Sequence, residues 1–321
     1  MRALVRQMQH LGTSLCIVIL IAGCGGGGGG GGSSNAAAQG NVLFAPDIGR
    51  TSMIGAFSTL NPSPGQLQGS LLTVSDRTGT NVQYDSARDL LYTAQGALNA
   101  QKMIAVFGNA SKATGSISPV RTWNLPADVV TVDKIVLDTA SDTLYVGGHR
   151  TYDNRIYVYS GASTLSGTPT PTHTFTPASG LIDFAVDVNR GLVYYTGNFP
   201  YGIYGISVST GTERHVACNG CVPSGVAIDA RNDRLYAANG TDEIHVIANA
   251  SLAQPADIAQ LSVANPLFLT FDPTNDRLYV SAYTRVFILN SVGAIGTSGS
   301  ISSATAVSVN GAISIGGFGI P

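Results

Sequence analysis

The clearest pattern of apolar and polar positions along the chain is a segment that recurs five times. Each copy is an apolar stretch that ends in Asp, four mostly polar residues, and a second apolar stretch that contains Leu-Tyr or Val-Tyr. This alternation predicts a β-hairpin, because Asp accepts hydrogen bonds from turn amides and polar residues separate two strands. The copies are VQYDSARDLLYTA (82–94), IVLDTASDTLYVG (135–147), FAVDVNRGLVYYT (184–196), VAIDARNDRLYAA (226–238) and LTFDPTNDRLYVS (269–281).

A further apolar strand is predicted after every hairpin, starting near residues 103, 155, 202, 243 and 285. A weaker fourth strand follows, for example at 171–179. The repeat Asp residues are 42 to 53 residues apart, and four strands at that period are typical of β-propeller blades. We therefore expect the repeat Asp residues to fix turns and the repeat Tyr residues to pack between blades.

The two ends of the chain supply incomplete repeats. The stretches at 41–46 and 52–60 have the pattern of a second and third strand, and 304–317 that of a first and second strand. The sequence therefore predicts an all-β fold, a β-propeller of six four-stranded blades whose ring is closed by both termini. Closure in this way removes exposed sheet edges. A seven-bladed ring is the alternative.

The repeat D-x-x-x-D-R-L-Y-V resembles the YVTN-type β-propeller repeat and, more loosely, the NHL and lactonase-like propellers. The resemblance extends over nearly all of residues 41–321. It implies a ligand face formed by the loops between second and third strands together with the loops that join blades. It implies no activity, because propellers host many functions.

The first forty residues differ from the repeats in composition. Arg2 and Arg6 precede a short apolar run at 15–23, which is typical of a secretory signal peptide, with a membrane-anchor helix as the alternative. The sequence IAGC at 21–24 resembles the lipobox of bacterial lipoproteins, which implies cleavage after residue 23 and lipid attachment at Cys24. Residues 24–40 are rich in glycine and are predicted to form a flexible tether.

The lipobox resemblance also implies a location. Gly25, rather than Asp, follows Cys24. Under the sorting rule known for some lipoproteins, this implies the outer membrane. We therefore expect a protein of the bacterial cell envelope, anchored in the outer membrane by its lipid, with the domain at 41–321 in the periplasm or on the cell surface.

Charge and cysteine content narrow the partners. Without Arg2 and Arg6 the chain has 15 basic and 19 acidic residues, which argues against nucleic acid as a partner.

Cys218 and Cys221 form a CNGC motif, for which we predict a local disulfide in an exported protein. A redox motif would normally lie at a helix start in a βαβ setting, and a zinc site would need a second ligand pair. The sequence shows neither, so these two interpretations of CNGC are less favoured.

The loops assigned to the ligand face are rich in polar side chains, above all the loop at 147–155. His149 with Asp153 has the residue types of a base and its orienting partner, although a solvated loop is the favoured interpretation. Weak candidates for binding Ca²⁺ or another divalent cation are Asp128, Asp133, Asp242 and Glu243; no other cofactor is predicted. The ligand-face residues that we predict are His149, Arg150, Tyr152, Asp153, Asn198, Tyr201, Asn239, Asp242, Glu243 and Tyr283.

These observations favour a lipid-anchored envelope propeller that acts as a binding module for a protein, peptide or glycan. Its membrane contact is expected through the lipid on Cys24. Two alternatives stay open: a lactonase-like, metal-dependent hydrolase of a small ester or lactone, and a structural component of an envelope assembly. No residue is assigned a catalytic role from the sequence, so an enzymatic activity is left undecided and less favoured.

Overall fold

The computed structural model describes residues 42–46, 53–58, 69–74, 78–96, 101–151, 153–198, 200–217, 222–282, 285–295 and 305–308. Contacts divide the chain into two units, Met1–Asn35 and Ala36–Pro321, and every described residue belongs to the second. The elements of the described residues are strands, apart from the single-turn 3₁₀ helices η2 (Ala110–Lys112) and η3 (Val292–Ala294). Within the described ranges no helix has the length and apolarity to cross a membrane.

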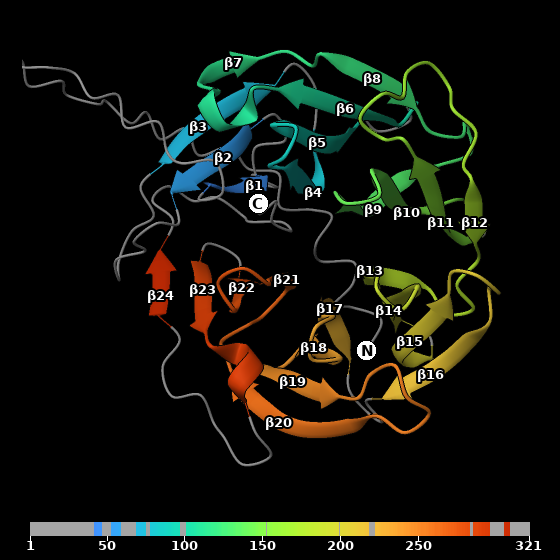
Figure 1. Cartoon of the computed structure of the whole chain (residues 1–321), viewed down its shortest axis with the longest axis vertical. Helices are drawn as coiled ribbons and strands as arrows, with labels where there is room; N and C mark the ends of the chain where they lie inside the picture. Colours follow the sequence, from blue (N-terminus) through green and yellow to red (C-terminus); the bar gives the residue numbers. More distant parts are fainter. Residues whose placement is uncertain are drawn as a thin grey trace, which may run out of the picture. The chain divides into compact units, whose positions relative to one another are not determined.

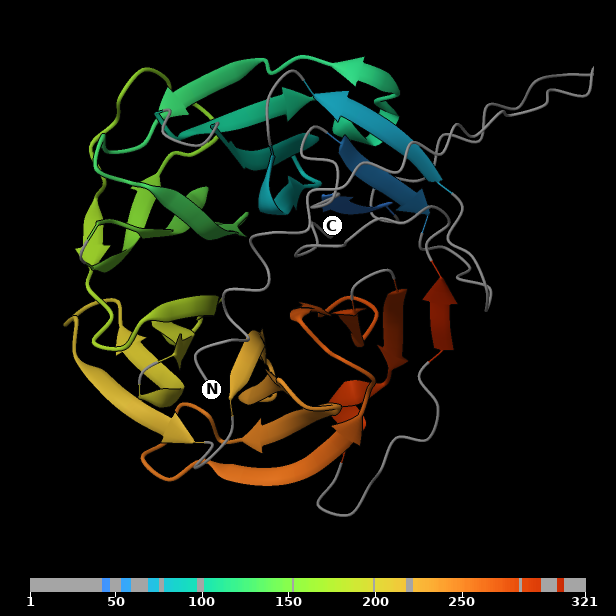
Figure 2. The same cartoon turned by 180° about the vertical axis from the view of Figure 1, so that it is seen from behind.

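Among the described residues, twenty-four strands form six four-stranded sheets around a central axis (Figure 1, and from behind in Figure 2). One sheet contains β1 (Val42–Pro46), β2 (Met53–Ser58), β3 (Gly69–Val74) and β7 (Gly115–Ile117), and the next contains β4 (Thr78–Asp85), β5 (Leu90–Gln95), β6 (Met103–Gly108) and β8 (Arg121–Asn124). The third contains β9 (Thr131–Asp138), β10 (Thr143–His149), β11 (Asn154–Ser160) and β12 (His173–Phe175).

The remaining sheets take their strands in simple chain order. They are β13 (Leu181–Asp187), β14 (Leu192–Asn198), β15 (Tyr201–Ser207) and β16 (Glu213–Ala217); β17 (Pro223–Asp229), β18 (Arg234–Asn239), β19 (Glu243–Ala248) and β20 (Ala256–Ser262); and β21 (Phe268–Asp272), β22 (Arg277–Ala282), β23 (Arg285–Asn290) and β24 (Thr305–Ser308). The predicted all-β propeller with four-stranded blades is therefore confirmed.

The blades are not the six equivalent units that the sequence predicted. Five sheets are antiparallel throughout, whereas in the first sheet β7 pairs in parallel with β3. In the chain, β7 lies between β6 and β8 of the second sheet, but it pairs at the edge of the first sheet. The structure thus has five antiparallel blades and a sixth sheet of different composition.

The predicted placement of the terminal strands is corrected in part, whereas residues 309–317 of the predicted closure lie outside the described residues. Residues 305–308 were expected in a first strand beside the N-terminal strands, but β24 pairs with β23 as the fourth strand of its own blade. Similarly, β1 lies at the end of its sheet in the described structure, although 41–46 was expected to be a second strand. Strand patterns at degenerate ends show that a strand forms, but not which edge it joins.

The repeat Asp fixes each hairpin turn as predicted. In the copy that contains Asp229, one carboxylate oxygen accepts the amides of Arg231 and Asn232 at 3.1 and 3.3 Å, and the other accepts the Asn232 side chain at 2.6 Å. The side-chain contact, with Arg, Ser or Asn three residues after the Asp, recurs at Asp85, Asp138, Asp187 and Asp272. The interpretation of these carboxylates as turn-fixing groups is therefore confirmed.

A second Asp in the turn connects the hairpin to the third strand of the same blade. Asp142 has a left-handed backbone with φ of 52°, and its carboxylate accepts the Ser163 amide at 3.0 Å and hydroxyl at 2.7 Å. Asp89 with Ser111 and Asp233 with Ser251 repeat this arrangement. The blade in which Gly191 takes the left-handed position has no such Asp.

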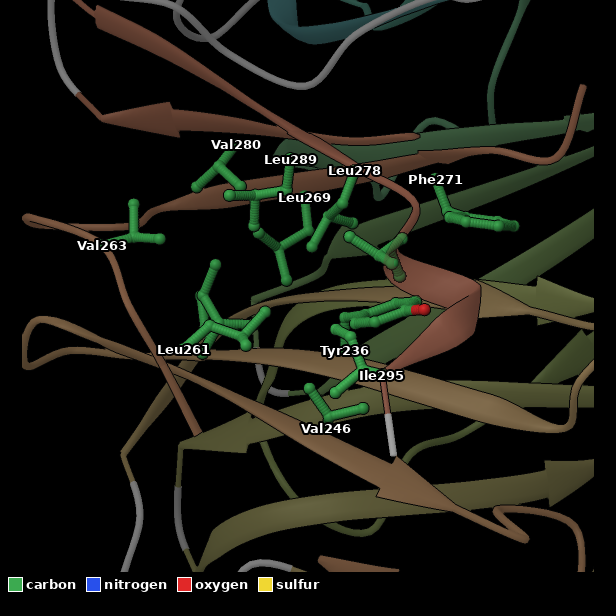
Figure 3. Close-up of a cluster of buried hydrophobic side chains, with 14 residues drawn as sticks. Tyr236, Val246, Leu261, Val263, Leu269, Phe271, Leu278, Val280, Leu289 and Ile295 are labelled. Carbon is green, nitrogen blue, oxygen red and sulfur yellow. The ribbon is translucent and has the colours of Figure 1, made fainter. Parts of the chain in front are cut away.

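The hydrophobic core is divided among the interfaces between neighbouring blades. Figure 3 shows one such cluster, in which Tyr236 and Val246 from one blade pack against Leu269, Leu278 and Val280 from the next. A single sheet has no other way to bury its face, so packing of successive blades supplies the apolar burial that stabilises each repeat. The repeat tyrosines are all buried, and four of them belong to these clusters, which confirms their predicted packing role: Tyr92, Tyr145, Tyr194 and Tyr236.

Candidate functional site

The first strands of the blades, which lie nearest the axis, have an open edge of backbone groups. Polar side chains of the preceding blade satisfy this edge. The Asn81 amide donates to the Ile135 carbonyl at 2.7 Å and accepts from the Ile135 amide at 2.8 Å, and Gln83 accepts from the Leu137 amide at 3.2 Å. The first strands are thereby tied together without a continuous sheet, which protects edges that otherwise invite pairing with another chain.

A β-bulge recurs at the same level of three first strands. The register shifts beside Asp133 in β9, Ile182 in β13 and Ser224 in β17, each five residues before the repeat Asp. Bulges change the direction of side chains and are frequent near functional sites. The next residue in each strand, four before the repeat Asp, is therefore directed by the bulge: Lys134, Asp183 and Gly225.

Lys134 and Asp183 form a buried ion pair between neighbouring blades. The Lys134 Nζ lies 2.8 Å from the Asp183 Oδ1, and the second carboxylate oxygen accepts the Val226 amide at 2.8 Å. Their side chains are 7% and 0% exposed. Burial raises the pKa of Asp183, while the Lys134 charge and hydrogen bond oppose this rise. The pair therefore keeps two charges in a nearly dry environment.

A second pair lies beside it. The His149 Nε2 is 3.2 Å from the Asp133 Oδ2. Burial raises the pKa of Asp133 well above its usual value, and the nearby Asp183 charge raises it further. Burial also lowers the pKa of His149. Both shifts favour the uncharged form of each partner.

A pocket of about 370 Å³ extends along the axis from Lys134 toward the hairpin turns. First strands of five blades line it: β4, β9, β13, β17 and β21. Its walls are largely apolar and include the partly exposed side chains of Val136, Val186 and Ile228. The turn residues Val188 and Arg231 also line it and are exposed, so the pocket opens at the mouth that bears the hairpin turns. The ligand face predicted from the sequence is the opposite mouth.

The predicted ligand-face residues of the third blade contact one another. Arg150 forms ion pairs with Asp128 and, at 3.5 Å, with Asp153, whose carboxylate also binds Arg155 at 2.6 Å. His149, with its contact to Asp133, begins the same loop. The loop is thus held by its own charges, and no residue of the other predicted sets joins it in the contacts of the described chain.

The predicted residues of the next two blades lie at the ends of second and third strands. Asn198 and Tyr201 are cross-strand partners, and the Tyr201 side chain is exposed. Asn239 accepts the Val222 amide at 3.2 Å, and Asp242 accepts the Asn265 amide at 2.7 Å. Glu243 lies 3.9 Å from His245, which is itself bound to Asp257 at 2.6 Å. These groups are placed by loop and strand contacts within their own blades or with the following connection.

The weak metal candidates are not gathered into a site. Asp128 and Asp133 belong to the third blade, whereas Asp242 and Glu243 belong to the fifth. Among the described residues, no group of three or more His, Cys, Asp or Glu side chains is placed to hold a metal ion. The predicted residues Cys24, Tyr152, Cys218, Cys221 and Tyr283 lie outside the described residues.

Sequence reasoning missed Lys134 and Asp183, although a signal was present. The repeat segments align from three residues before the repeat Asp, so the position of both Lys134 and Asp183 falls one residue before the alignment. There the five copies have Asn81, Lys134, Asp183, Gly225 and Phe268. The residue at this position differs in every blade: Asn81 and Asp183 both bind the backbone of a following blade, whereas a buried ion pair is found only where Lys134 and Asp183 meet.

The comparisons with known proteins agree with the fold and go no further. No protein-family model matches the chain, and no curated protein shows significant similarity to it. The structure is similar to a chain in the crystal structure of a nidogen/laminin complex, with a TM-score of 0.60 and 13% identity over 88% of this chain and 98% of that one. It is also similar to a functionally unknown protein from Desulfotomaculum acetoxidans DSM 771, with a TM-score of 0.54 and 10% identity over 80% and 78% of the two chains.

Proposed function

We propose that this protein is a lipid-anchored component of the bacterial outer membrane whose propeller is a binding module. We count the sixth sheet as a blade of its ring. The ligand, a molecule or segment of the envelope such as a peptide or glycan, binds in the axial channel. The lipobox-like sequence at Cys24 supports the anchor, and the propeller fold supports an interaction role.

The observation that carries the binding role is the axial pocket with the Lys134–Asp183 pair at its inner end. Burying two charges is costly even when they are paired, so this arrangement is poor evidence of a purely stabilising role. The charged residues occupy a position at which other blades have uncharged residues, namely Asn81, Gly225 and Phe268. A largely apolar concave pocket with a few placed polar groups is the usual form of a ligand site.

The experiment fills the pocket without disturbing the fold. Thr270 lines the pocket on β21 and is partly exposed, so Thr270→Tyr obstructs the channel with a residue that suits a strand. Thr122→Tyr makes the same change at an exposed position of the outer strand β8 and serves as the matched control. Each full-length variant is purified from membranes, and bound envelope molecules are identified by mass spectrometry.

We expect a ligand to accompany the native protein and the Thr122→Tyr variant, and to be missing from Thr270→Tyr. Retention of the same molecules by all three proteins contradicts a ligand site in the channel.

A further inference from the structure

The charged groups that line the axial pocket have unused hydrogen-bond donors rather than unused acceptors. An ammonium has three N–H donors. The contacts of Lys134 are the Asp183 carboxylate at 2.8 Å and, at 3.5 Å, the Val226 carbonyl. Asp183 is fully buried and already accepts from Lys134 and from the Val226 amide. At the inner end of the pocket, the group offered to a ligand is therefore the ammonium.

The open end of the pocket also has more unused hydrogen-bond donors than unused acceptors. The Arg231 guanidinium has five N–H donors, lies 3.6 Å from Asp229 and is 53% exposed. It also lies over the Phe271 ring, 5.8 Å from its centroid. The acidic residue at this rim, Asp138, is by contrast occupied by the amides of Ala140 and Ser141. The rim thus supplies hydrogen-bond donors.

The walls between these two ends are apolar. Val136, Val186 and Ile228, which are all partly exposed, come from three different blades. They match the hydrocarbon or aromatic part of a ligand, because burial of apolar surface is favourable and these side chains form no hydrogen bonds with water. The volume of about 370 Å³ lies in the lower part of the range for small-molecule sites.

We propose that the axial pocket binds a small organic acid, with its carboxylate at Lys134 and its apolar body along the channel toward Phe271 and Arg231. This inference rests on the proposed binding role of the pocket and specifies the ligand's chemical class. A carboxylate is favoured over a neutral acceptor because hydrogen bonds between an ammonium and a carboxylate are charge-assisted and stronger. The ion pair with Asp183 holds the ammonium in place for this contact.

The test compares two probes that differ in charge and little in shape. The full chain in lipid nanodiscs is titrated by calorimetry with 4-phenylbutyrate and with 4-phenylbutanamide, and empty nanodiscs provide the reference. We expect the acid to bind about tenfold more tightly than the amide, in keeping with the added strength of a charge-assisted hydrogen bond. Equal affinities overturn the proposal for an acid while leaving a binding role intact, and binding of neither probe also overturns it.

Variants locate the carboxylate. Lys134→Met combined with Asp183→Asn removes both charges, so no buried charge is left unpaired. We expect this double variant to bind the acid no more tightly than the amide. Lys112→Met, an exposed lysine on η2, is the matched control and keeps the preference. Arg231→Gln changes a half-exposed side chain. We expect it to weaken binding of the acid about threefold and to leave binding of the amide unchanged, as expected for a charge at the rim. An unchanged preference in the double variant overturns the assignment to Lys134.

Discussion

Loss of Lys134 alone should destabilise the protein far more than loss of the whole ion pair. Lys134→Met leaves Asp183, whose side chain is 0% exposed, without its cation. Removing one partner of a buried ion pair costs about 3–5 kcal/mol, whereas replacing both partners is often nearly neutral. For a domain of this size the single variant should therefore unfold roughly 10 °C below the native protein. The double variant Lys134→Met/Asp183→Asn should recover most of this loss.

The deficit of the single variant should also depend on pH. Burial already raises the pKa of Asp183, whereas the charge of Lys134 lowers it. Removal of Lys134 therefore raises the pKa of Asp183 further. The folded variant then binds a proton at a pH at which the unfolded chain does not, so its stability rises as pH falls toward the raised pKa. The deficit is largest at neutral and higher pH and becomes smaller in mild acid.

Thermal unfolding between pH 5 and pH 8 measures both effects, followed by circular dichroism, with Lys112→Met as the control for loss of a surface charge. The control should change stability by no more than about 0.5 kcal/mol. The reasoning is refuted if Lys134→Met has a small deficit independent of pH, or if the two single substitutions simply add in the double variant, since contacting partners must couple.

Four further predictions follow from local contacts. Gly225→Ala places a Cβ 2.2 Å from the Leu267 carbonyl oxygen and should cost about 1–3 kcal/mol in chemical denaturation, whereas Gly240→Ala, with its nearest contact at 3.5 Å, should be close to neutral. Asp142→Ala should lower stability by about 1 kcal/mol more than Asp142→Gly, because both lose the Ser163 contacts but only alanine is strained at φ of 52°; equal losses in urea titrations argue against this strain. Cys24→Ser should move the protein from the membrane to the soluble fraction, and an unchanged distribution contradicts the lipid anchor. Cys218 and Cys221 should react with iodoacetamide only after reduction, as read by intact mass, and labelling without reductant contradicts the disulfide.

The sequence by itself determined the hairpins and their stacking. Asp229 and Asn232 fix a turn through contacts only two or three residues apart, and Tyr236 is buried on the face that its alternation assigns to it. These features depend on short-range hydrogen bonds and on strand periodicity, which a single repeat contains. The left-handed Asp residues that bind Ser111, Ser163 and Ser251 were also visible as a repeated pattern, although they were not recognised.

The tertiary structure decided which strand closes which sheet and where the charged groups of different blades meet. The parallel placement of β7 beside β3 and the pairing of β24 with β23 have no local sequence signature, because each depends on which sheet edge is open nearby. Lys134 and Asp183 are 49 residues apart and meet because two bulged first strands lie side by side at the axis. Repeats encode the blade through local chemistry, whereas the pocket arises from contacts between blades, whose geometry exists only after the ring has formed.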